Sequence, residues 1–433
     1  MPTYSDSSTN VNAGMSFNQL STVLTSIVNQ ATGQAVITPV TTADFVSVAQ
    51  TGLKTGVDPI LGAINQVLSK TIFSIRPYSA KFREIEWDSQ KWGNHTRKIN
   101  YGDTGFEEDN RLGRDVSGTF TGWANGDSAD MFKIKKPLIL QTNWYSQNQY
   151  QKHYTVFRDQ LDAAFSGPDE FQRFITGMVS TVTDELEKAR EEFSRAVIAN
   201  YIGALYAQNA STRDTGRVIK LCTEFATDQG VTSDIGSDEG DKWATAYAYC
   251  MDPDVYDRFV KWMFARIAII SDLMTERSME YQSKITISGS VVPIMRHTPY
   301  EKQRMYLYTD VLKNIDTRVL SAAFHDNYLK IGKHATVNYW QSIGSTSRDS
   351  IKVVPATINA AGAYSANSSA SATEVSKILG IIFDEEAIGI TQYSTWSAPT
   401  PFNPAGGYSN FFYHMSLQGL NDLTEKGVLL LLE

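Results

Sequence analysis

Histidines and cysteines most often carry catalysis or bind metals, but their spacing in this chain indicates neither role. The chain has 433 residues, six of them histidines and two of them cysteines. It has no H-E-x-x-H metal-binding spacing, no P-loop and no G-x-G-x-x-G phosphate-binding loop. His325 stands beside Asp326, as in half of a catalytic dyad, although such neighbours more often form the polar end of a helix.

Two acidic segments and the cysteines are equally weak candidates for chemistry. Residues 384–386 follow an apolar run and can bind a cation, yet acids in that place more often begin a short helix. The loop 234–241 lacks the alternating oxygen spacing of a calcium site. Cys222 and Cys250 are too few for a disulfide framework and are predicted to be buried thiols. We therefore expect no catalytic, cofactor-binding or metal-binding residue, no cofactor and no enzymatic activity.

Charged side chains of both signs are concentrated instead in residues 78–143. The tract 102–126 is rich in glycine and aspartate and predicts the turn of a long hairpin, with 131–140 as the returning strand. A hairpin with so few core residues is unstable alone, so we expect it to project and to pair with another molecule. The alternative is a long surface loop. Mixed charges favour contact between subunits over phosphate binding. The predicted contact residues are Arg83, Arg97, Lys98, Glu107, Glu108, Asp109, Arg111 and Arg114.

The element that must support these contacts is a long helix, predicted from 168 to about 209. Pro168 suits a first turn, and Asp169 and Glu170 suit the positive end of the helix dipole. Roughly 40 residues give a rod about 60 Å long, which needs a partner surface along its length and suits a thin shell subunit. Its predicted core stripe is Phe171, Phe174, Ile175, Met178, Val182, Leu186, Phe193 and Val197. Its other face carries Asp184, Glu185, Glu187, Lys188, Glu191, Glu192 and Arg195.

The N-terminal part of the chain, 1–77, has a different composition. Residues 1 to about 42 are rich in serine, threonine, asparagine and glutamine, and Asp6 is their one charged side chain. Such a segment has little to bury, so we expect an extended arm that a neighbour orders, or a disordered leader. Helices are predicted at 43–53 and 59–69, and a strand at 71–76.

Residues 211–375 alternate helical and strand patterns, which predicts an α+β domain with helices packed on a sheet. The strongest helix signal there is Asp252 as cap followed by Pro253. Further predicted elements are strands at 284–295, 304–308 and 335–340, a helix at 312–324 and a surface loop at 356–373. Residues 144–167 are predicted to be a polar connection with a short helix at 157–165. Apolar strands at 377–383, 409–417 and 427–432 return to the long helix, which would make 211–375 an insertion.

Charge and hydropathy exclude several other classes of protein. The formal net charge is −8, which implies no general affinity for phosphate backbones. The apolar run 428–432 is too short to span a bilayer, so no membrane partner is expected. The N-terminus lacks the pattern of a signal peptide, and the scarcity of cysteine suits a reducing cytoplasm.

This order of parts resembles the major capsid proteins of tailed bacteriophages with the Hong Kong 97-type fold. Three stretches are similar to the short-tailed phages of the phi-29 group: TGLKTGVDPILGAINQVLSKTIFSIRP, FSGPDEFQRFITGMVSTVTDELEKAREEFSRAVIANYI and FFYHMSLQGL. In the terms of that fold, 1–77 would be the N-arm with short helices and 78–143 the E-loop hairpin. Residues 144–210 and 376–433 would be the P-domain with its spine helix, and 211–375 the inserted A-domain.

The resemblance implies a shell-forming subunit of a virion. Copies would assemble in the host cytoplasm as pentamers and hexamers of an icosahedral head, by heterologous contacts within each ring. A scaffold protein and a portal would take part, and the shell would enclose double-stranded DNA without sequence-specific binding. The alternatives are an encapsulin-like nanocompartment shell, a portal or tail subunit, or an enzyme of unknown type.

Overall fold

The computed structural model of the chain describes most of its length, with gaps. The described residues are 17–33, 38–39, 41–54, 59–60, 63, 80–87, 95–102, 119, 122, 126, 128, 131–132, 134, 139–145, 147–209, 214, 216–236, 238, 240–287, 290–292, 294–318, 333–342, 347–359, 361–365 and 372–433. Side chains are not described at 17–19, 53, 175–176, 178–181, 183, 287, 290, 314–318, 333–334 and 365. The predicted strand at 71–76, most of the predicted helix at 59–69 and most of the tract 102–126 lie outside these residues.

The chain divides into two compact units. Unit 1 consists of Met1–Asn94, Ser146–Phe193 and Ile390–Gln418, and unit 2 of His95–Tyr145, Ser194–Gly389 and Gly419–Glu433. Three elements contribute residues to both units: α5 (Pro168–Gln208), β14 (Ile388–Pro399) and β15 (Tyr408–Asn421). The predicted helix at 168–209 is therefore confirmed as α5, and the predicted strand at 409–417 as part of β15.

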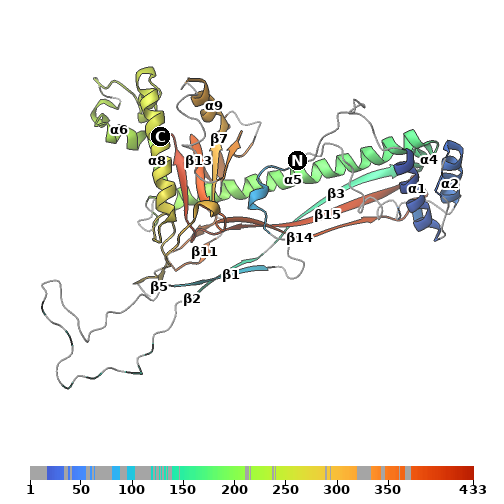
Figure 1. Cartoon of the computed structure of the whole chain (residues 1–433), viewed down its shortest axis with the longest axis horizontal. Helices are drawn as coiled ribbons and strands as arrows, with labels where there is room; N and C mark the ends of the chain where they lie inside the picture. The colour runs from blue at the N-terminus through green and yellow to red at the C-terminus, as the bar shows by residue number, and fades with distance from the viewer. Residues whose placement is uncertain are drawn as a thin grey trace, which may run out of the picture. The chain divides into compact units, whose positions relative to one another are not determined.

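Unit 1 contains a sheet that runs alongside α5 (Figure 1). Its other elements are α1 (Phe17–Thr32), α2 (Thr42–Lys54), η1 (Arg83–Ile85), β3 (Asn148–Phe157) and α4 (Arg158–Ala164). The strand order is β14-β15-β3, and β15 pairs antiparallel with β3, with Phe411 opposite Tyr154. The edge of the Tyr150 ring lies against Phe193 of α5, with the ring centroids 6.1 Å apart. Aromatic contacts therefore join the sheet to the helix.

The core of unit 1 forms around the first turn of α5. The Phe171 ring is stacked on Phe165 and meets Phe45 of α2 edge-on, at centroid distances of 5.5 and 5.8 Å. Helix α1 adds a buried stripe to this core, consisting of Leu20, Leu24, Ile27 and Val28. The prediction of an extended arm or disordered leader is therefore wrong for residues 17–32. These four apolar residues recur at helical spacing and bury one face of an otherwise polar segment.

Unit 2 is built on a five-stranded sheet of the described residues, in the order β4-β16-β13-β7-β8. Its strands are β4 (Val218–Lys220), β16 (Gly427–Leu431), β13 (Ile378–Asp384), β7 (Gln303–Tyr308) and β8 (Lys333–Val337). Strand β13 pairs antiparallel with β16 and β7, whereas β4 and β8 are parallel to their neighbours. All seven residues of β13 are buried, because it is the central strand.

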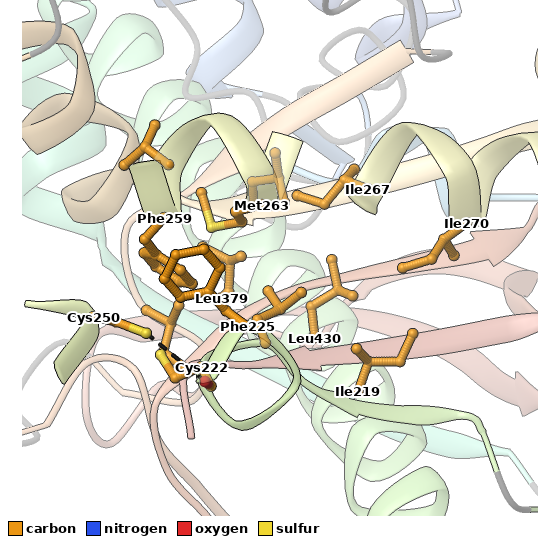
Figure 2. Close-up of a cluster of buried hydrophobic side chains, with 14 of the residues drawn as sticks. Ile219, Cys222, Phe225, Cys250, Phe259, Met263, Ile267, Ile270, Leu379 and Leu430 are labelled. Atoms are coloured by element: carbon orange, nitrogen blue, oxygen red, sulfur yellow. Dashed lines mark hydrogen bonds between the residues drawn. The ribbon is translucent and has the colours of Figure 1, made fainter. Parts of the chain in front are cut away.

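Helices cover this sheet and complete the larger core (Figure 2). Helix α8 (Pro253–Thr275) begins as predicted, with Asp252 as its cap, and its buried face includes Phe259, Met263 and Ile267. Helices α6 (Leu221–Asp228) and α7 (Ala246–Cys250) supply Phe225 and the two cysteines. Cys222 and Cys250 are buried free thiols, which confirms that prediction. The hydrogen bond with the Cys250 thiol and burial both raise the pKa of Cys222, which favours its protonated form.

Short elements and small sheets complete unit 2. They are β1 (His95–Tyr101), β2 (Ile139–Tyr145), η3 (Thr232–Asp234), β5 (Thr286–Ile287), β6 (Ser290–Val291), η4 (Tyr300–Lys302), α9 (Thr309–Arg318), β9 (Ile351–Val353), β10 (Thr357–Ile358), β11 (Tyr364–Ser365) and β12 (Thr373–Val375). Strand β1 pairs antiparallel with β2 over its whole length. The predicted returning strand at 131–140 is wrong for residues 131, 132 and 134, which are not in a strand, and β2 begins at Ile139 instead.

Several predicted elements differ from the structure. The connection at 144–167 contains the strand β3 as well as the predicted short helix, seen as α4. The predicted strand at 284–295 is the pair β5 and β6, and the predicted loop at 356–373 contains the pair β10 and β11. Strand β14 was not predicted, because its polar residues break the apolar pattern. The predicted domain boundaries stay a prediction.

Candidate functional site

The paired strands β1 and β2 have two chemically distinct faces. On one face, Ile99 and Tyr101 of β1 are 47% and 68% exposed, and Ile139 and Tyr145 of β2 are 56% and 67% exposed. Arg97 lies on the same exposed face, opposite Asn143. Large apolar side chains exposed on one sheet face are typical of a surface that binds another protein. This exposed face of β1–β2 is the first candidate site.

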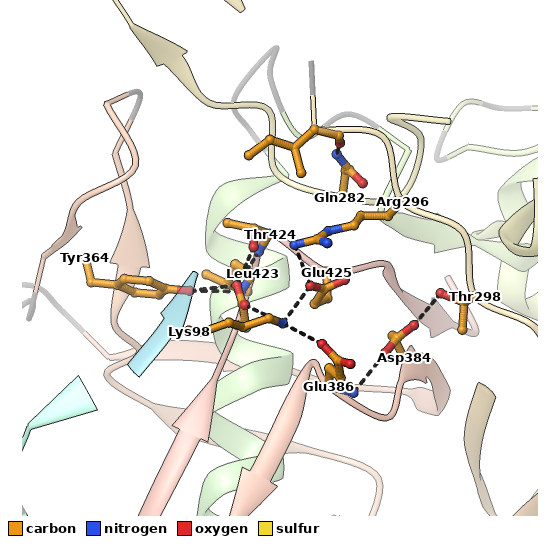
Figure 3. A network of polar contacts seen from close by, with 12 residues as sticks. Lys98, Gln282, Arg296, Thr298, Tyr364, Asp384, Glu386, Leu423, Thr424 and Glu425 are labelled. Atoms are coloured by element: carbon orange, nitrogen blue, oxygen red, sulfur yellow. Dashed lines mark hydrogen bonds and ion pairs between the residues drawn. The ribbon is translucent and has the colours of Figure 1, made fainter. Parts of the chain in front are cut away.

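The opposite face of β1 carries Lys98, whose ammonium contacts three carboxylates of unit 2 (Figure 3). Lys98 Nζ lies 2.6 Å from Glu425 Oε1, 3.0 Å from Asp422 Oδ2 and 3.1 Å from Glu386 Oε2. Arg296 Nη2 approaches the same Glu425 oxygen at 2.8 Å. We call these five residues the Lys98 cluster. Only Glu386 in it has a half-exposed side chain, while those of Asp422 and Glu425 are buried.

The acids of the Lys98 cluster lie on two turns, one directly after β13 and one directly before β16 of the main sheet. Glu386 lies after β13, in a turn where its N–H donates to Asp384 Oδ1 at 2.8 Å. Asp422 lies between β15 and β16, and its Oδ1 accepts from Thr424 N at 2.9 Å. The Asp422 N–H donates to Ala387 O at 2.8 Å, which joins the two turns. The acids are therefore held on a common rigid platform.

Arg217 fastens the second turn from inside the unit. The guanidinium is buried and donates to the carbonyl oxygens of Leu423 at 2.9 Å, Gly427 at 3.1 Å and Glu425 at 3.3 Å. Its remaining contacts are to Ser283 and Tyr201. A planar guanidinium can donate in several directions at once, so one side chain satisfies the carbonyl groups of a whole turn.

The electrostatics of the Lys98 cluster favour a permanently charged lysine. Burial opposes the ammonium, but the charges of Asp422 and Glu425 outweigh it and raise the pKa of Lys98 above its ordinary value. Burial raises the pKa of Glu425, and the like charge of Asp422 adds to this, while Lys98 and Arg296 oppose it. The three carboxylates thus depend on the two cations for their charge balance.

A second polar site lies in unit 1, on α5. Glu187 accepts from Ala80 N at 3.0 Å and from Arg83 at 2.8 Å, and Arg190 lies 3.3 Å away. Burial opposes its charge, but these hydrogen bonds and cations together lower the pKa of Glu187. Glu191 accepts from Lys81 N at 3.4 Å. The segment 80–87 is thereby fastened across α5.

The predicted contact residues have different places in the structure. Arg83 pairs with Glu187, Lys98 belongs to the Lys98 cluster, and Arg97 is exposed. The other five, Glu107, Glu108, Asp109, Arg111 and Arg114, lie outside the described residues. A role of these eight residues between subunits remains a prediction.

The predicted core stripe of α5 is buried along part of its length. Phe171, Val182, Phe193 and Val197 are buried, Phe174 and Leu186 are half-buried, and the side chains of Ile175 and Met178 are not described. Part of the face predicted to be polar and open is also buried, namely Glu187, Glu191 and Arg195. Arg195 lies over the Tyr339 ring, 3.7 Å from its centroid. These charges are covered because other segments of the chain supply partners for them.

Asp422, Glu425, Arg217 and Glu187 are the site residues that the sequence did not reveal. Asp422 and Glu425 stand in a short polar turn between two apolar strands, which marks a turn but not its partner more than 300 residues away. Glu187 and Glu191 are four residues apart on one helix face, a pattern that also occurs on solvated helices.

The described residues contain no cluster of His, Cys, Asp and Glu side chains able to hold a metal ion. His325 and Asp326 lie outside them. Of the helices in the described part of the chain, none is long and apolar enough to cross a membrane.

Comparison with known proteins gives matches to solved structures and to one family model. Solved structures similar in fold include the capsid of Staphylococcus phage Andhra, at 11% identity, with 83% of this chain and 86% of that one covered and a TM-score of 0.49. A structure of the head fibre and inner core protein of native bacteriophage P68 is 11% identical, with 84% and 87% covered and a TM-score of 0.49. The cyanophage P-SCSP1u capsid is 10% identical, with 84% and 91% covered and a TM-score of 0.42. No curated protein matches the chain. The family model described as Phi29-like phage major capsid protein matches residues 24–421.

Proposed function

Because the chain belongs to the Phi29-like phage major capsid protein family, and is thus a shell-forming virion protein of a tailed phage, we propose that it builds the shell with Hong Kong 97-type parts. In this proposal α5 is the spine of a thin wall, and β1, β2 and their connection are the E-loop. The proposed boundaries are 1–77, 78–143, 144–210 with 376–433, and 211–375. The subunit acts structurally, without catalysis.

The exposed face of β1–β2 is the observation that supports this proposal most directly. Its large side chains, Ile99, Tyr101, Ile139 and Tyr145, are about half or more exposed in the single chain. Burying such side chains against another copy would stabilise the contact by roughly 25 cal/mol for each Å² of apolar surface removed from water. Arg97, in the middle of this face, would add orientation through a charged hydrogen bond. A second copy of the same chain is the proposed partner.

The proposed assembly is a closed icosahedral head. Copies form pentamers and hexamers by heterologous contacts, in which the exposed face of β1–β2 meets a different surface of the next copy. The shell encloses double-stranded DNA without sequence-specific binding, and the negative net charge suits a wall that does not trap DNA. A scaffold protein and a portal take part, and assembly occurs in the host cytoplasm. The family assignment favours this function over a nanocompartment shell and over a portal or tail subunit.

Electron microscopy of the purified subunit, co-expressed with its neighbouring genes, tests the proposal. The expected result is closed shells of uniform diameter. Uniform small rings, or discrete subunits in the presence of a scaffold, would contradict it. Substituting Tyr101→Asp should sharply reduce the yield of shells, because it places a charge in the proposed contact, whereas Tyr101→Phe should keep the yield.

A further inference from the structure

The strands β1 and β2 are attached to unit 2 in an unusual way. Their exposed face is rich in large apolar residues, whereas their fully buried side chains are the polar Thr96, Asn100 and Thr142. In a sheet held by a hydrophobic core the apolar side chains face inward instead. Leu140 and Trp144 are half-buried and add some apolar contact. Polar interactions must therefore supply most of the attachment of β1 and β2 to the rest of unit 2.

Lys98 is at the centre of that polar attachment. It lies midway between Thr96 and Asn100 on the inner face of β1, directly opposite Thr142 of β2. Its ammonium reaches Glu386 on one turn of the platform, and Asp422 and Glu425 on the other. Its own side chain is only 15% exposed. One cation thus joins the middle of the hairpin base to two turns that are distant in the sequence.

The platform itself does not depend on Lys98. Arg217 holds the turn 422–427 through its carbonyl oxygens, and Tyr364 OH accepts from Leu423 N at 3.0 Å. The turn after β13 is held by Asp384 through Glu386 N. Loss of Lys98 therefore frees the paired strands but leaves the two turns in place, and Glu425 keeps its ion pair with Arg296.

We propose that Lys98 is a positioning residue for shell assembly: it fixes the direction in which the β1–β2 hairpin leaves unit 2. The residue acts through its own chain and does not touch the neighbouring copy. This inference rests on the proposed function, because a fixed direction matters only if the hairpin must meet a second copy. It gives Lys98 a different role from that of Arg97, which lies on the opposite face and is proposed to contact the neighbour.

The first test measures amide hydrogen exchange on the unassembled subunit carrying Lys98→Met. Removing one partner of a buried ion pair costs about 3 kcal/mol or more, so the amides of residues 95–101 and 139–145 should exchange on the order of a hundredfold faster. The amides of β13 and α8 should keep their protection. Lys98→Arg, which retains the charge, should stay close to wild type. Lys352→Met is the matched control, because Lys352 pairs with Glu374 at 3.5 Å and both side chains are exposed.

The second test measures shell formation by wild type and by the same variants, each co-expressed with the neighbouring genes. Lys98→Met should lose closed shells at least about tenfold in yield, whereas Lys98→Arg and Lys352→Met should retain them. Wild-type failure to form shells would count against the proposed function, whereas normal shells of Lys98→Met would overturn only the role of Lys98. Unchanged hydrogen exchange at β1 and β2 in Lys98→Met would also overturn the positioning role of Lys98.

A milder variant keeps the proposal testable if Lys98→Met fails to fold. Glu386→Gln removes the half-exposed carboxylate of the Lys98 cluster and leaves Asp422 and Glu425 in place. Faster exchange confined to β1 and β2 in this variant would support the positioning role. Wild-type exchange at β1 and β2 in Glu386→Gln, combined with global unfolding of Lys98→Met, would assign Lys98 to general stability and overturn it.

Discussion

Glu187 stabilises unit 1 as an ionised carboxylate, because neighbouring groups favour its charged form. Its pKa is lowered by Ala80 N–H, Arg83 and Arg190, against the opposing effect of burial. A carboxylate with a lowered pKa stabilises the fold fully above its unfolded pKa of about 4.3, and this contribution is lost as the pH falls through the folded pKa. Glu187→Gln should therefore lower the free energy of unfolding by about 2 kcal/mol at neutral pH.

The pH dependence separates this effect from a general loss of packing. The difference in unfolding free energy between wild type and Glu187→Gln should shrink as the pH is lowered into the acid range, because wild-type Glu187 then becomes neutral as well. Chemical denaturation of the unassembled subunit at several pH values measures this difference in unfolding free energy. Glu192→Gln is the control, since Glu192 pairs with Lys188 at 3.8 Å on an exposed surface and should show little change. A difference in unfolding free energy that stays constant with pH would show that the charge of Glu187 does not cause the stabilisation.

Arg217 provides a second test at the scale of single residues. Its guanidinium donates to three carbonyl groups of the turn 422–427, and Arg217→Met would remove that donor from all three, with Leu423 O keeping the Ser283 N–H at 3.0 Å. We expect a loss of about 3 kcal/mol in unfolding free energy. Arg217→Lys should recover only part of it, because an ammonium cannot reproduce the planar fork. Arg258→Lys, an exposed substitution on α8, should be neutral. A neutral Arg217→Met would mean that water replaces the guanidinium.

At the scale of elements, the start of α5 packs into the core of unit 1. Phe171 is fully buried between Phe45 and Phe165, so Phe171→Ala should cost about 3–5 kcal/mol, measured by thermal or chemical unfolding. Phe157→Ala is the control, because Phe157 is 46% exposed. The loss of unfolding free energy for Phe174→Ala should lie between those of Phe171→Ala and Phe157→Ala, since the Phe174 side chain is half-buried. Equal losses at the three positions would show that the stripe is not ordered as described.

The elements that the sequence predicted correctly are those with local signals at their ends. Helices α5 and α8 both begin with proline followed by an acid, and β13 and β16 are continuous apolar runs. Strand β3 could not be predicted in the same way, because NQYQKHYTVF is largely polar and aromatic and its strand state depends on pairing with β15. Helix α1 had a readable apolar stripe, but its serine, threonine and asparagine content obscured it.

The sites could be predicted less well than the elements, because they join residues that are distant in the chain. Lys98 was recognised as notable, but for a contact with another subunit. Its carboxylate partners lie at 386, 422 and 425, and only the folded sheet brings the two turns together. Glu187 was placed on the charged face of the long helix, and no local pattern indicates that Ala80 and Arg83 contact it. Local spacing carries information about periodicity but not about such pairings.

At the scale of the whole molecule, the main question is whether the long hairpin is needed for folding of the subunit or for assembly of the shell. Residues 102–126 lie in the sequence between β1 and β2, whose described contacts with the rest of unit 2 are largely polar. Deleting 102–126 should therefore leave the unfolding transition of the isolated subunit nearly unchanged. Closed shells should be lost, because the deletion removes the segment that we propose contacts the neighbouring copy.

A replacement of the same tract by a glycine-serine linker of equal length distinguishes sequence from length. The linker keeps the reach of the chain but removes its charged residues, Glu107, Glu108, Asp109, Arg111 and Arg114 among them. Failure of both variants to form shells, seen by electron microscopy beside folded subunits, would assign the contact to these side chains. Shells formed by the linker variant alone would mean that only the length of the loop is needed. Normal shells from the deletion would remove the hairpin from the set of intersubunit elements and leave α5 and the sheets as the sole wall.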